Sequence, residues 1–328
     1  MATAIERNPI RNRGLKMIPV DQEKRHDEWL QIRRGYIGGS DAGAIIGLNP
    51  YASAFSVWAE KTGKTPEFGG NISTRTGTLL EDLVARLFME ETGKKVQRLN
   101  FTIVNEEYPF ACANIDREII GEDAILECKT TTSYLNVKKF RTGEYPEQWY
   151  AQMTHYLAVT GAKKAYLAVL IECRDFRIFE LERDEEEIKA LMDAERHFWN
   201  TYVLTRKTPP VDGHSATSDT IKQMFTEEAG DNVDLSGLLD TFQRRKILKG
   251  QIDSLNEQMD SLDNSIKVAM GSNPKGTCGR FSVSWKIQNT NGLDRKKMKE
   301  DFPEIDFKKY ATQSRIFRVT EKKEKSVA

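Results

Sequence analysis

One short segment, which combines apolar residues with two opposite charges, most restricts what this chain of 328 residues can fold into. Residues 124–130 read Ala-Ile-Leu-Glu-Cys-Lys-Thr and follow the turn-forming residues 121–123, Gly-Glu-Asp. A mostly apolar run bounded by such a turn is typical of a strand. Because side chains alternate across a strand, Glu127 and Lys129 are expected on one face, and Leu126 and Cys128 on the other.

A second carboxylate is expected beside the first. Asp116 lies on or next to another predicted strand, residues 110–115, and the turn at 121–123 would join the two strands as a hairpin that places Asp116 beside Glu127. Two converging carboxylates form an oxygen-rich site for Mg²⁺, with Mn²⁺ as an alternative and one or two ions bound. Lys129 could orient the attacking water or neutralise charge on a phosphate. The alternative is an ordinary ion pair on a solvated sheet, because this motif also occurs by chance.

Two predicted helices flank this strand. Residues 76–88 carry apolar side chains with helical spacing, and Glu81 lies near the first turn, where a carboxylate also suits the helix dipole. Residues 146–157 begin with a helix-compatible proline and place Trp149, Gln152 and Tyr156 on one face. The alternatives are a plain helix carboxylate for Glu81 and a core amide, hydrogen-bonded to the backbone, for Gln152.

A glycine-containing loop near the N-terminus is predicted to bind phosphate. Gly38 and Gly39 could adopt positive φ and approach a ligand closely, and Ser40 and Asp41 could cap a helix over residues 42–48. The two arginines at 33–34 lie just upstream and suit a phosphate. The alternative is an ordinary capped turn, since Asp41 would repel phosphate unless it points away or joins the metal network.

Taken together, these segments resemble the YqaJ-type viral recombinases, which are similar to phage lambda exonuclease and belong to the restriction-endonuclease-like PD-(D/E)XK superfamily. The resemblance runs in order over roughly residues 25–205, and its combined signal is stronger than any single motif. The residues that carry it are Arg33 to Ala42, Asn49-Pro50-Tyr51, Trp58 to Gly63, Gly77 to Glu81, Asp116, Glu127-Cys128-Lys129 and Gln152 to Tyr156.

The resemblance implies roles for individual residues. The catalytic set would be Glu81, Asp116, Glu127, Lys129 and Gln152. The metal ligands would be Asp116, Glu127, the backbone carbonyl of Cys128, and Glu81 through a water molecule. The residues that bind the 5′-phosphate or DNA would be Ser40, Asn114 and one or both of Arg33 and Arg34, which the sequence does not separate.

The resemblance also implies an activity and partners. We expect Mg²⁺-dependent 5′ to 3′ digestion of one strand at double-stranded DNA ends, which leaves a 3′ overhang for a single-strand annealing protein, and a homo-oligomer in the form of a ring trimer. A structure- or sequence-specific endonuclease on the same fold is an alternative, because one fold hosts many functions. A non-catalytic DNA-end-binding mediator is the other.

The amino-acid composition limits the kinds of binding site and cellular location that can be expected. Lys plus Arg and Asp plus Glu number 49 each, which counts against strong nonspecific DNA binding but not against a basic channel. Four cysteines form no CxxC pair, which argues against zinc and iron–sulfur sites and for reduced thiols. The sequence shows neither a long apolar span nor a signal peptide. We therefore expect no membrane association and a cytoplasmic location. The family resemblance implies a bacterial host, with the protein as a phage or prophage product.

The predicted fold class is α/β (α+β): a restriction-endonuclease-like core, with a central mixed sheet between helices, and a C-terminal helical and β-hairpin appendage. Strands are expected at 165–171 and 176–181 and a long helix at 184–203. The expected organisation is a loose polar arm at 1–24, a nuclease domain at 25–207, a linker at 208–218, an accessory region at 219–320 and a charged tail at 321–328.

The accessory region contains a heptad pattern. Leu248, Leu255, Leu262 and Ala269 recur every seven residues, and three further apolar residues, at 252, 259 and 266, follow at an offset of four. This pattern predicts either a coiled coil between subunits or a helical hairpin that packs on its own domain through residues 235–248. Strands at 281–287 and 314–319 are expected to pair. The basic run at 295–299 predicts a solvated helix face or a contact with backbone phosphates.

Overall fold

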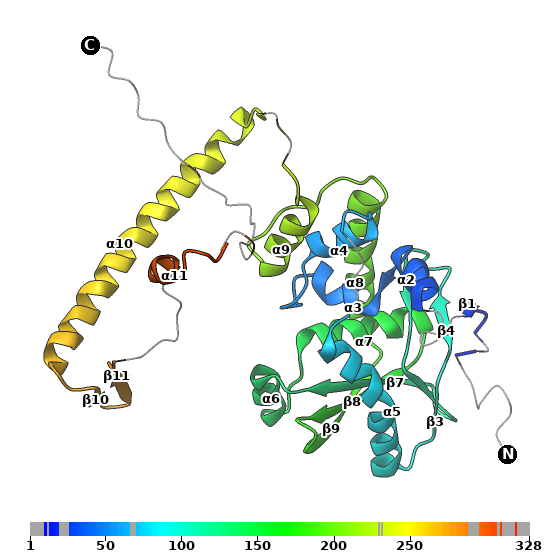
Figure 1. The fold of residues 1–328 in the computed structure, drawn as a ribbon. Coiled ribbons are helices and arrows are strands. Elements are labelled where there is room, and N and C mark those ends of the chain that lie inside the picture. The colour runs from blue at the N-terminus through cyan, green and yellow to red at the C-terminus, as the bar shows by residue number, and fades with distance from the viewer. Residues whose placement is uncertain are drawn as a thin grey trace. The chain divides into compact units, whose positions relative to one another are not determined.

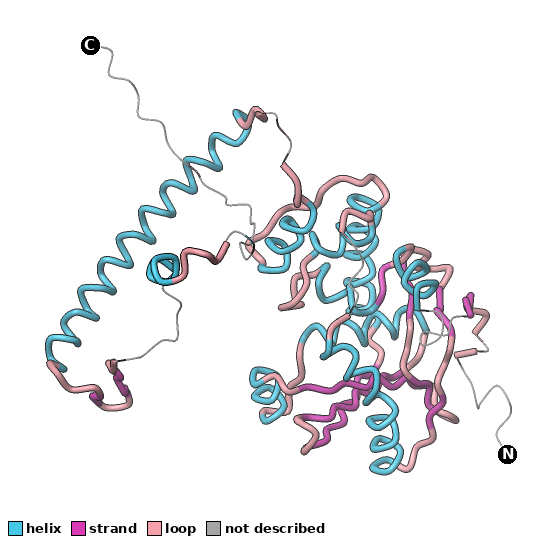
Figure 2. Tube along the Cα trace, viewed as in Figure 1, coloured by secondary structure: helices cyan, strands magenta, loops and turns pink. Residues whose placement is uncertain are grey.

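The computed structural model describes residues 10–11, 13–19, 26–65, 70–228, 230, 232–287, 295–306, 309 and 319. Its internal contacts divide the chain into two units, Met1–Thr226 and Glu227–Ala328. Figures 1 and 2 show the helices and strands of both units. The predicted charged tail at 321–328 lies outside the described residues.

The first unit combines two mixed sheets with helices. Its elements in chain order are β1 (Lys16–Pro19), α2 (His26–Arg34), β2 (Ile37–Gly38), α3 (Gly39–Ile45), α4 (Ala54–Lys61), α5 (Ile72–Thr92), β3 (Val96–Gln97), β4 (Phe101–Val104), β5 (Ala111–Ala113), β6 (Arg117–Ile119), β7 (Ala124–Thr131), α6 (Tyr134–Arg141), α7 (Glu147–Thr160), β8 (Lys164–Ile171), β9 (Asp175–Glu182), α8 (Glu185–Phe198), a π-helical turn η1 (Trp199–Val203) and α9 (Ser215–Met224). The predicted mixed α/β class is confirmed.

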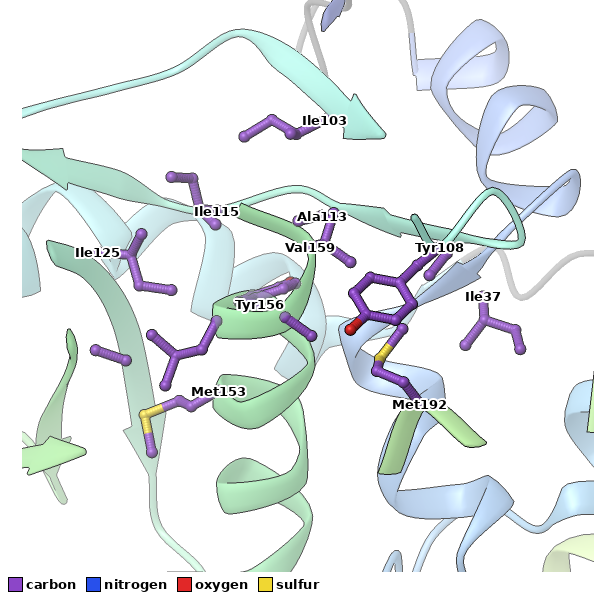
Figure 3. Packing of buried hydrophobic residues seen from close by; sticks show 14 of the residues in the cluster. Ile37, Ile103, Tyr108, Ala113, Ile115, Ile125, Met153, Tyr156, Val159 and Met192 are labelled. Atoms are coloured by element: carbon purple, nitrogen blue, oxygen red, sulfur yellow. The ribbon is translucent and has the colours of Figure 1, made fainter. Parts of the chain in front are cut away.

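The five-stranded sheet has the order β3-β6-β7-β8-β9, in which only the central β7–β8 pair is parallel. Alternation of side chains gives this sheet two apolar faces. Leu126 packs with Val84 and Phe88 of α5 on one face, and Ile125 packs with Met153 of α7 on the other. Figure 3 shows Ile125 and Met153 in this second cluster. The long central strand β7 is therefore held between two helices.

The four-stranded sheet has the order β1-β4-β5-β2, and in the chain β3 of the five-stranded sheet falls between its strands β2 and β4. The strand predicted at 110–115 is β5 of this sheet, so it does not form the hairpin with β7. The antiparallel partner of β7 is β6, where Arg117 lies opposite Leu126. Gly121, with φ of +83°, lies in the turn between them. The chain thus passes from one sheet to the other at residues 114–116.

Two predicted boundaries differ from the structure. Within the predicted N-terminal arm, the described residues are ordered parts of the first unit, because β1 pairs with β4, Ile10 is fully buried and Arg13 forms an ion pair with Asp123. The remaining residues of the arm, 1–9, 12 and 20–24, lie outside the described part. At the other end, the predicted linker includes Thr217, which is buried and donates from Oγ1 to Oγ of Ser53 at 2.7 Å. The first unit therefore continues through α9.

The second unit comprises η2 (Ser236–Leu238), α10 (Leu239–Met270), β10 (Lys275–Cys278), β11 (Phe281–Ser284) and α11 (Arg295–Asp301). Helix α10 is continuous, so the predicted helical hairpin around residues 235–248 is wrong. Strand β11 pairs with β10. Apart from residue 319, the predicted strand at 314–319 lies outside the described residues. In the part of the chain that the structure describes, no helix is long and apolar enough to span a membrane.

Candidate active site

The fold brings the predicted acidic residues together at the point where the chain changes sheets. Asp116 immediately precedes β6, and its Oδ2 accepts a hydrogen bond from the backbone N–H of Cys128 at 2.7 Å. This bond fixes the carboxylate beside β7, next to Glu127, a residue that is only 3% exposed. The predicted hairpin between residues 110–115 and β7 is therefore wrong, but the β6–β7 hairpin still places Asp116 beside Glu127.

Glu127 is at the centre of a small hydrogen-bonded network. Its Oε1 lies 2.6 Å from Nζ of Lys129 and 2.8 Å from Nε2 of Gln152. Gln152 also donates to the hydroxyl of Tyr156 at 3.1 Å. The second oxygen of Glu127, Oε2, is buried and has no hydrogen-bond partner in the described structure. A buried carboxylate oxygen without a partner is unfavourable unless a cation or a donor completes it.

Burial and neighbouring charges shift the pKa of each of the two carboxylates. Burial raises the pKa of Asp116 well above its ordinary value, and the negative charges of Glu127 and Glu81 raise it further. Burial also raises the pKa of Glu127, although Lys129 partly offsets this effect. Burial alone would lower the pKa of Lys129, but Glu127 and Asp116 outweigh it and the pKa rises. The site thus holds more negative charge than its lysine neutralises.

These residues fit a divalent cation of the magnesium type. Two carboxylates converge there, one with an unpartnered buried oxygen, and the backbone carbonyl of Cys128 lies in the same strand. Within the described residues, no three His, Cys, Asp or Glu side chains form a ready metal cluster. Mg²⁺ does not require one, because it keeps several waters and takes one or two carboxylates together with substrate phosphates.

Glu81 is held beside the site by arginines that sequence reasoning missed. Nη1 of the buried Arg117 contacts Oε1 of Glu81, and Nη2 of Arg98 lies 3.0 Å from the same oxygen. Both arginines also contact Asp82. Glu81 lies in the middle of α5 rather than in its first turn, so the predicted support from the helix dipole is wrong. In the sequence, the position of Arg117 directly after Asp116 was the signal that could have indicated an arginine at this site.

The glycine-containing loop forms a second polar cluster. Arg33 contacts Oγ of the exposed Ser40 and lies over the ring of Trp29, 5.3 Å from its centroid. Arg33 is therefore the arginine that the fold pairs with Ser40, a distinction the sequence left open. Nη2 of Arg33 also lies 3.5 Å from Oδ1 of Asp41.

Asp41 points away from solvent and is neutralised inside the protein. Its Oδ2 lies 2.8 Å from Nζ of Lys61, whose side chain is fully buried, and accepts from the backbone N–H of Gly38 at 2.9 Å. Although burial opposes it, the positive charges of Lys61 and Arg33 lower the pKa of Asp41 to about 2. Oε1 of Glu60 lies 3.8 Å from Nζ of Lys61, so the cluster contains two cations and two carboxylates, and Asp41 is paired inside it. Lys61 was missed by sequence reasoning.

The glycines of this loop act differently from the prediction. Gly38 has a φ of −98° and ends β2, and neither Gly38 nor Gly39 has positive φ. Helix α3 begins at Gly39, so Ser40 and Asp41 lie in its first turn rather than before it. Gly39 is required by close packing instead, since a Cβ there would lie 2.5 Å from Cε1 of Tyr156.

Asn114 and His155 have internal partners. Nδ2 of Asn114 donates to Oγ1 of Thr102 at 2.8 Å, which connects it to β4. His155 is fully buried, with Nδ1 2.9 Å from Oε1 of Glu195 and Nε2 2.9 Å from the carbonyl oxygen of Cys112. Both ring nitrogens thus face oxygen atoms, to which a protonated imidazole donates from both sides. The structure gives His155 a role in joining α7, α8 and β5.

Comparisons with known proteins find relatives that match part or most of this chain. The family model of the YqaJ-like viral recombinase domain matches residues 28–163. The uncharacterized protein YqaJ of Bacillus subtilis is 40% identical over 295 residues, which cover 88% of this chain and 92% of that protein. Protein D345L of African swine fever virus is 39% identical over 67 residues, 20% of this chain and 19% of that protein.

Among solved structures, the alkaline exonuclease LHK-Exo from Laribacter hongkongensis is similar with a TM-score of 0.46 and 20% identity, covering 55% of this chain and 97% of that one. A phage related exonuclease from Haemophilus somnus 129PT is similar with a TM-score of 0.42 and 14% identity, covering 54% of this chain and 99% of that one.

Proposed function

Because the chain belongs to the family of YqaJ-like viral recombinases, we propose that it is a metal-dependent deoxyribonuclease that digests one strand of linear duplex DNA from its 5′ end. The observation that carries this proposal is the convergence of Asp116, Glu127 and Lys129, with a buried, unpartnered carboxylate oxygen among them.

The acidic cluster supplies the chemistry. Asp116, Glu127 and the carbonyl of Cys128 would hold Mg²⁺, or Mn²⁺ in its place, with Glu81 attached through a water. When bound, such an ion would supply polarisation of the phosphodiester and a more acidic water. Lys129 would orient the attacking water and stabilise the negative charge that develops on the phosphate. Gln152 fixes the position of Glu127, since it donates to the same oxygen that Lys129 contacts.

The cluster of Arg33 and Ser40 would determine the direction in which the strand is digested. Arg33 and Ser40 bind the terminal 5′-phosphate, because Arg33 presents a planar guanidinium beside an exposed hydroxyl. Lys61 is too deeply buried to reach DNA and instead neutralises Asp41, so that Arg33 keeps its charge for the phosphate. A 5′-phosphate held here places the strand end at a fixed position relative to the acidic cluster. The product is a 3′ overhang, which a single-strand annealing protein would take up.

The direct test is digestion of linear duplex DNA with either 5′-phosphate or 5′-hydroxyl ends, labelled on each strand in turn, with Mg²⁺, Mn²⁺ or EDTA. We expect metal-dependent release of nucleotides from the 5′-phosphorylated strand and slower release from 5′-hydroxyl ends. Equal cleavage of closed circular and linear DNA would show an endonuclease. Binding of DNA ends without cleavage under any metal condition would show a non-catalytic mediator.

A further inference from the structure

Helix α10 carries an apolar stripe that the proposed nuclease does not use. Seven residues at a and d positions form this stripe, here called the α10 seam: Leu248, Ile252, Leu255, Met259, Leu262, Ile266 and Ala269. All are exposed, and the six large ones have between 44% and 64% of their surface accessible. The helix lies outside the region matched by the family model. An ordered stripe of this kind usually marks an interface.

The spacing of the seam specifies the shape of what covers it. Apolar residues that recur every 3.5 residues face one partner only when two helices wrap around each other. A sheet or a flat surface does not require this repeat. Because α10 runs unbroken from Leu239 to Met270, it has no second half that could fold back to cover the seam.

We propose that the α10 seam pairs with α10 of a second copy of this chain, in antiparallel orientation. In one alignment of the two antiparallel helices, each layer of the interface pairs an a residue of one copy with a d residue of the other. Ile252 faces Leu262 of the second copy, Met259 faces Leu255 and Ile266 faces Leu248. The terminal layers place Arg245 opposite the small Ala269, which leaves space for the guanidinium to reach water.

Charges beside the seam favour this orientation. In the antiparallel register, Lys249 of each copy lies opposite Asp263 of the other, which gives two oppositely charged pairs, and Asn256 lies opposite Asn256. In a parallel pair, Arg244 would lie opposite Lys249, and Arg245 would face its own copy inside the seam. Charged pairs beside the seam influence the relative orientation of the two helices more than the strength of dimerisation, because exposed ion pairs are individually weak.

The test is cross-linking in the full chain, with Cys173→Ser and Cys278→Ser to remove the two exposed thiols. We expect Asn256→Cys to give a covalent dimer with a short bis-maleimide, because residue 256 meets itself in the antiparallel register. Ile252→Cys is the matched control, since residue 252 meets itself only in a parallel pair. A dimer from Ile252→Cys alone, or from neither variant, overturns the proposal; in the second case, another partner or the chain's own first unit covers the seam.

Exchanging the charges at positions 249 and 263 provides a second test of the antiparallel pairing. Lys249→Glu is expected to weaken dimerisation several-fold in sedimentation, and the double variant Lys249→Glu with Asp263→Lys is expected to restore it. Within one helix, Nζ of Lys249 lies 3.0 Å from Asp253, a contact that the double variant does not restore. Recovery in the double variant therefore reports the contact between copies. Tighter association of the single variant would indicate a parallel pair.

Discussion

Gly39 and Tyr156 pack so closely that a methyl group on Gly39 would lie 2.5 Å from the ring of Tyr156. The Tyr156 hydroxyl accepts a hydrogen bond from Gln152, which in turn donates to Glu127. One aromatic ring therefore connects the loop that carries Ser40 with the acidic cluster.

Gly39→Ala is expected to destabilise the protein by about 1–3 kcal/mol, because the ring of Tyr156 is 6% exposed and has little room to move. Urea unfolding at neutral pH measures this change. Gly77→Ala is the matched control: its methyl group would meet only ordinary contact, 3.9 Å from Oγ1 of Thr130, and alanine should stabilise this helical position by about 0.5–1 kcal/mol. Equal effects of the two changes would contradict the packing argument.

Gln152→Leu removes the amide but keeps a similar volume. Glu127 then loses one of the two donors to Oε1, and cleavage is expected to fall roughly 10- to 100-fold with a higher Mg²⁺ requirement. Tyr156→Phe is the control, since it leaves the bond between Gln152 and Glu127 in place. Titration of the cleavage rate with Mg²⁺ separates the two variants, and a Gln152→Leu enzyme with unchanged metal dependence would refute the positioning role.

Asp116→Asn is expected to abolish cleavage and to raise the melting temperature in EDTA, because it removes one of the mutually repelling carboxylates while an amide oxygen can still accept from Cys128. Thermal melting with and without Mg²⁺ checks both parts. The wild type should gain stability on adding Mg²⁺, and the variant should gain much less. A variant that melts lower than the wild type in EDTA would show that repulsion is not the dominant effect.

Arg33→Ala is expected to remove the preference for 5′-phosphorylated ends and to leave slow cleavage of 5′-hydroxyl ends nearly unchanged. The reason is that Arg33 is the arginine in contact with Ser40. Rates on the two substrates, compared with those of Arg34→Ala, provide the measurement. If Arg34→Ala loses the preference and Arg33→Ala retains it, the assignment is reversed.

The pair of His155 and Glu195 predicts a pH dependence of stability. Although burial opposes it, the charge of Glu195 raises the pKa of His155 above its ordinary 6.5. The free energy that this pair contributes is therefore fully present below about pH 6.5 and decreases as the pH rises through the higher folded-state pKa. The negative charge of Asp41 also raises the pKa of His155.

The difference in unfolding free energy between the wild type and His155→Gln, measured by urea unfolding from pH 6 to 9, should consequently shrink with rising pH. At pH 6 it should amount to roughly 3–5 kcal/mol, because the variant leaves Glu195 buried without a cation. A difference that stays constant across this range would mean that the imidazole does not change charge there.

Local patterns in the sequence were sufficient to predict the central strand and the elements next to it. Strand alternation placed Glu127 and Lys129 on one face, and helical spacing placed Gln152 and Tyr156 together, because both depend on nearby residues only. The pairing of β7 with β6 rather than with β5, and the burial of Lys61 beside Asp41, depend on contacts between segments far apart in the chain. No local pattern encodes those contacts, so the sequence alone did not reveal them.

The passage of the chain between its two sheets at residues 114–116 bears on when activity can arise during synthesis. Asp116 is positioned by β5 on one side and by β6 and β7 on the other, and Gln152 arrives still later in the chain. A nascent or partly folded chain cannot bring these groups together. The proposed cleavage of DNA therefore requires that both sheets and α7 have assembled first.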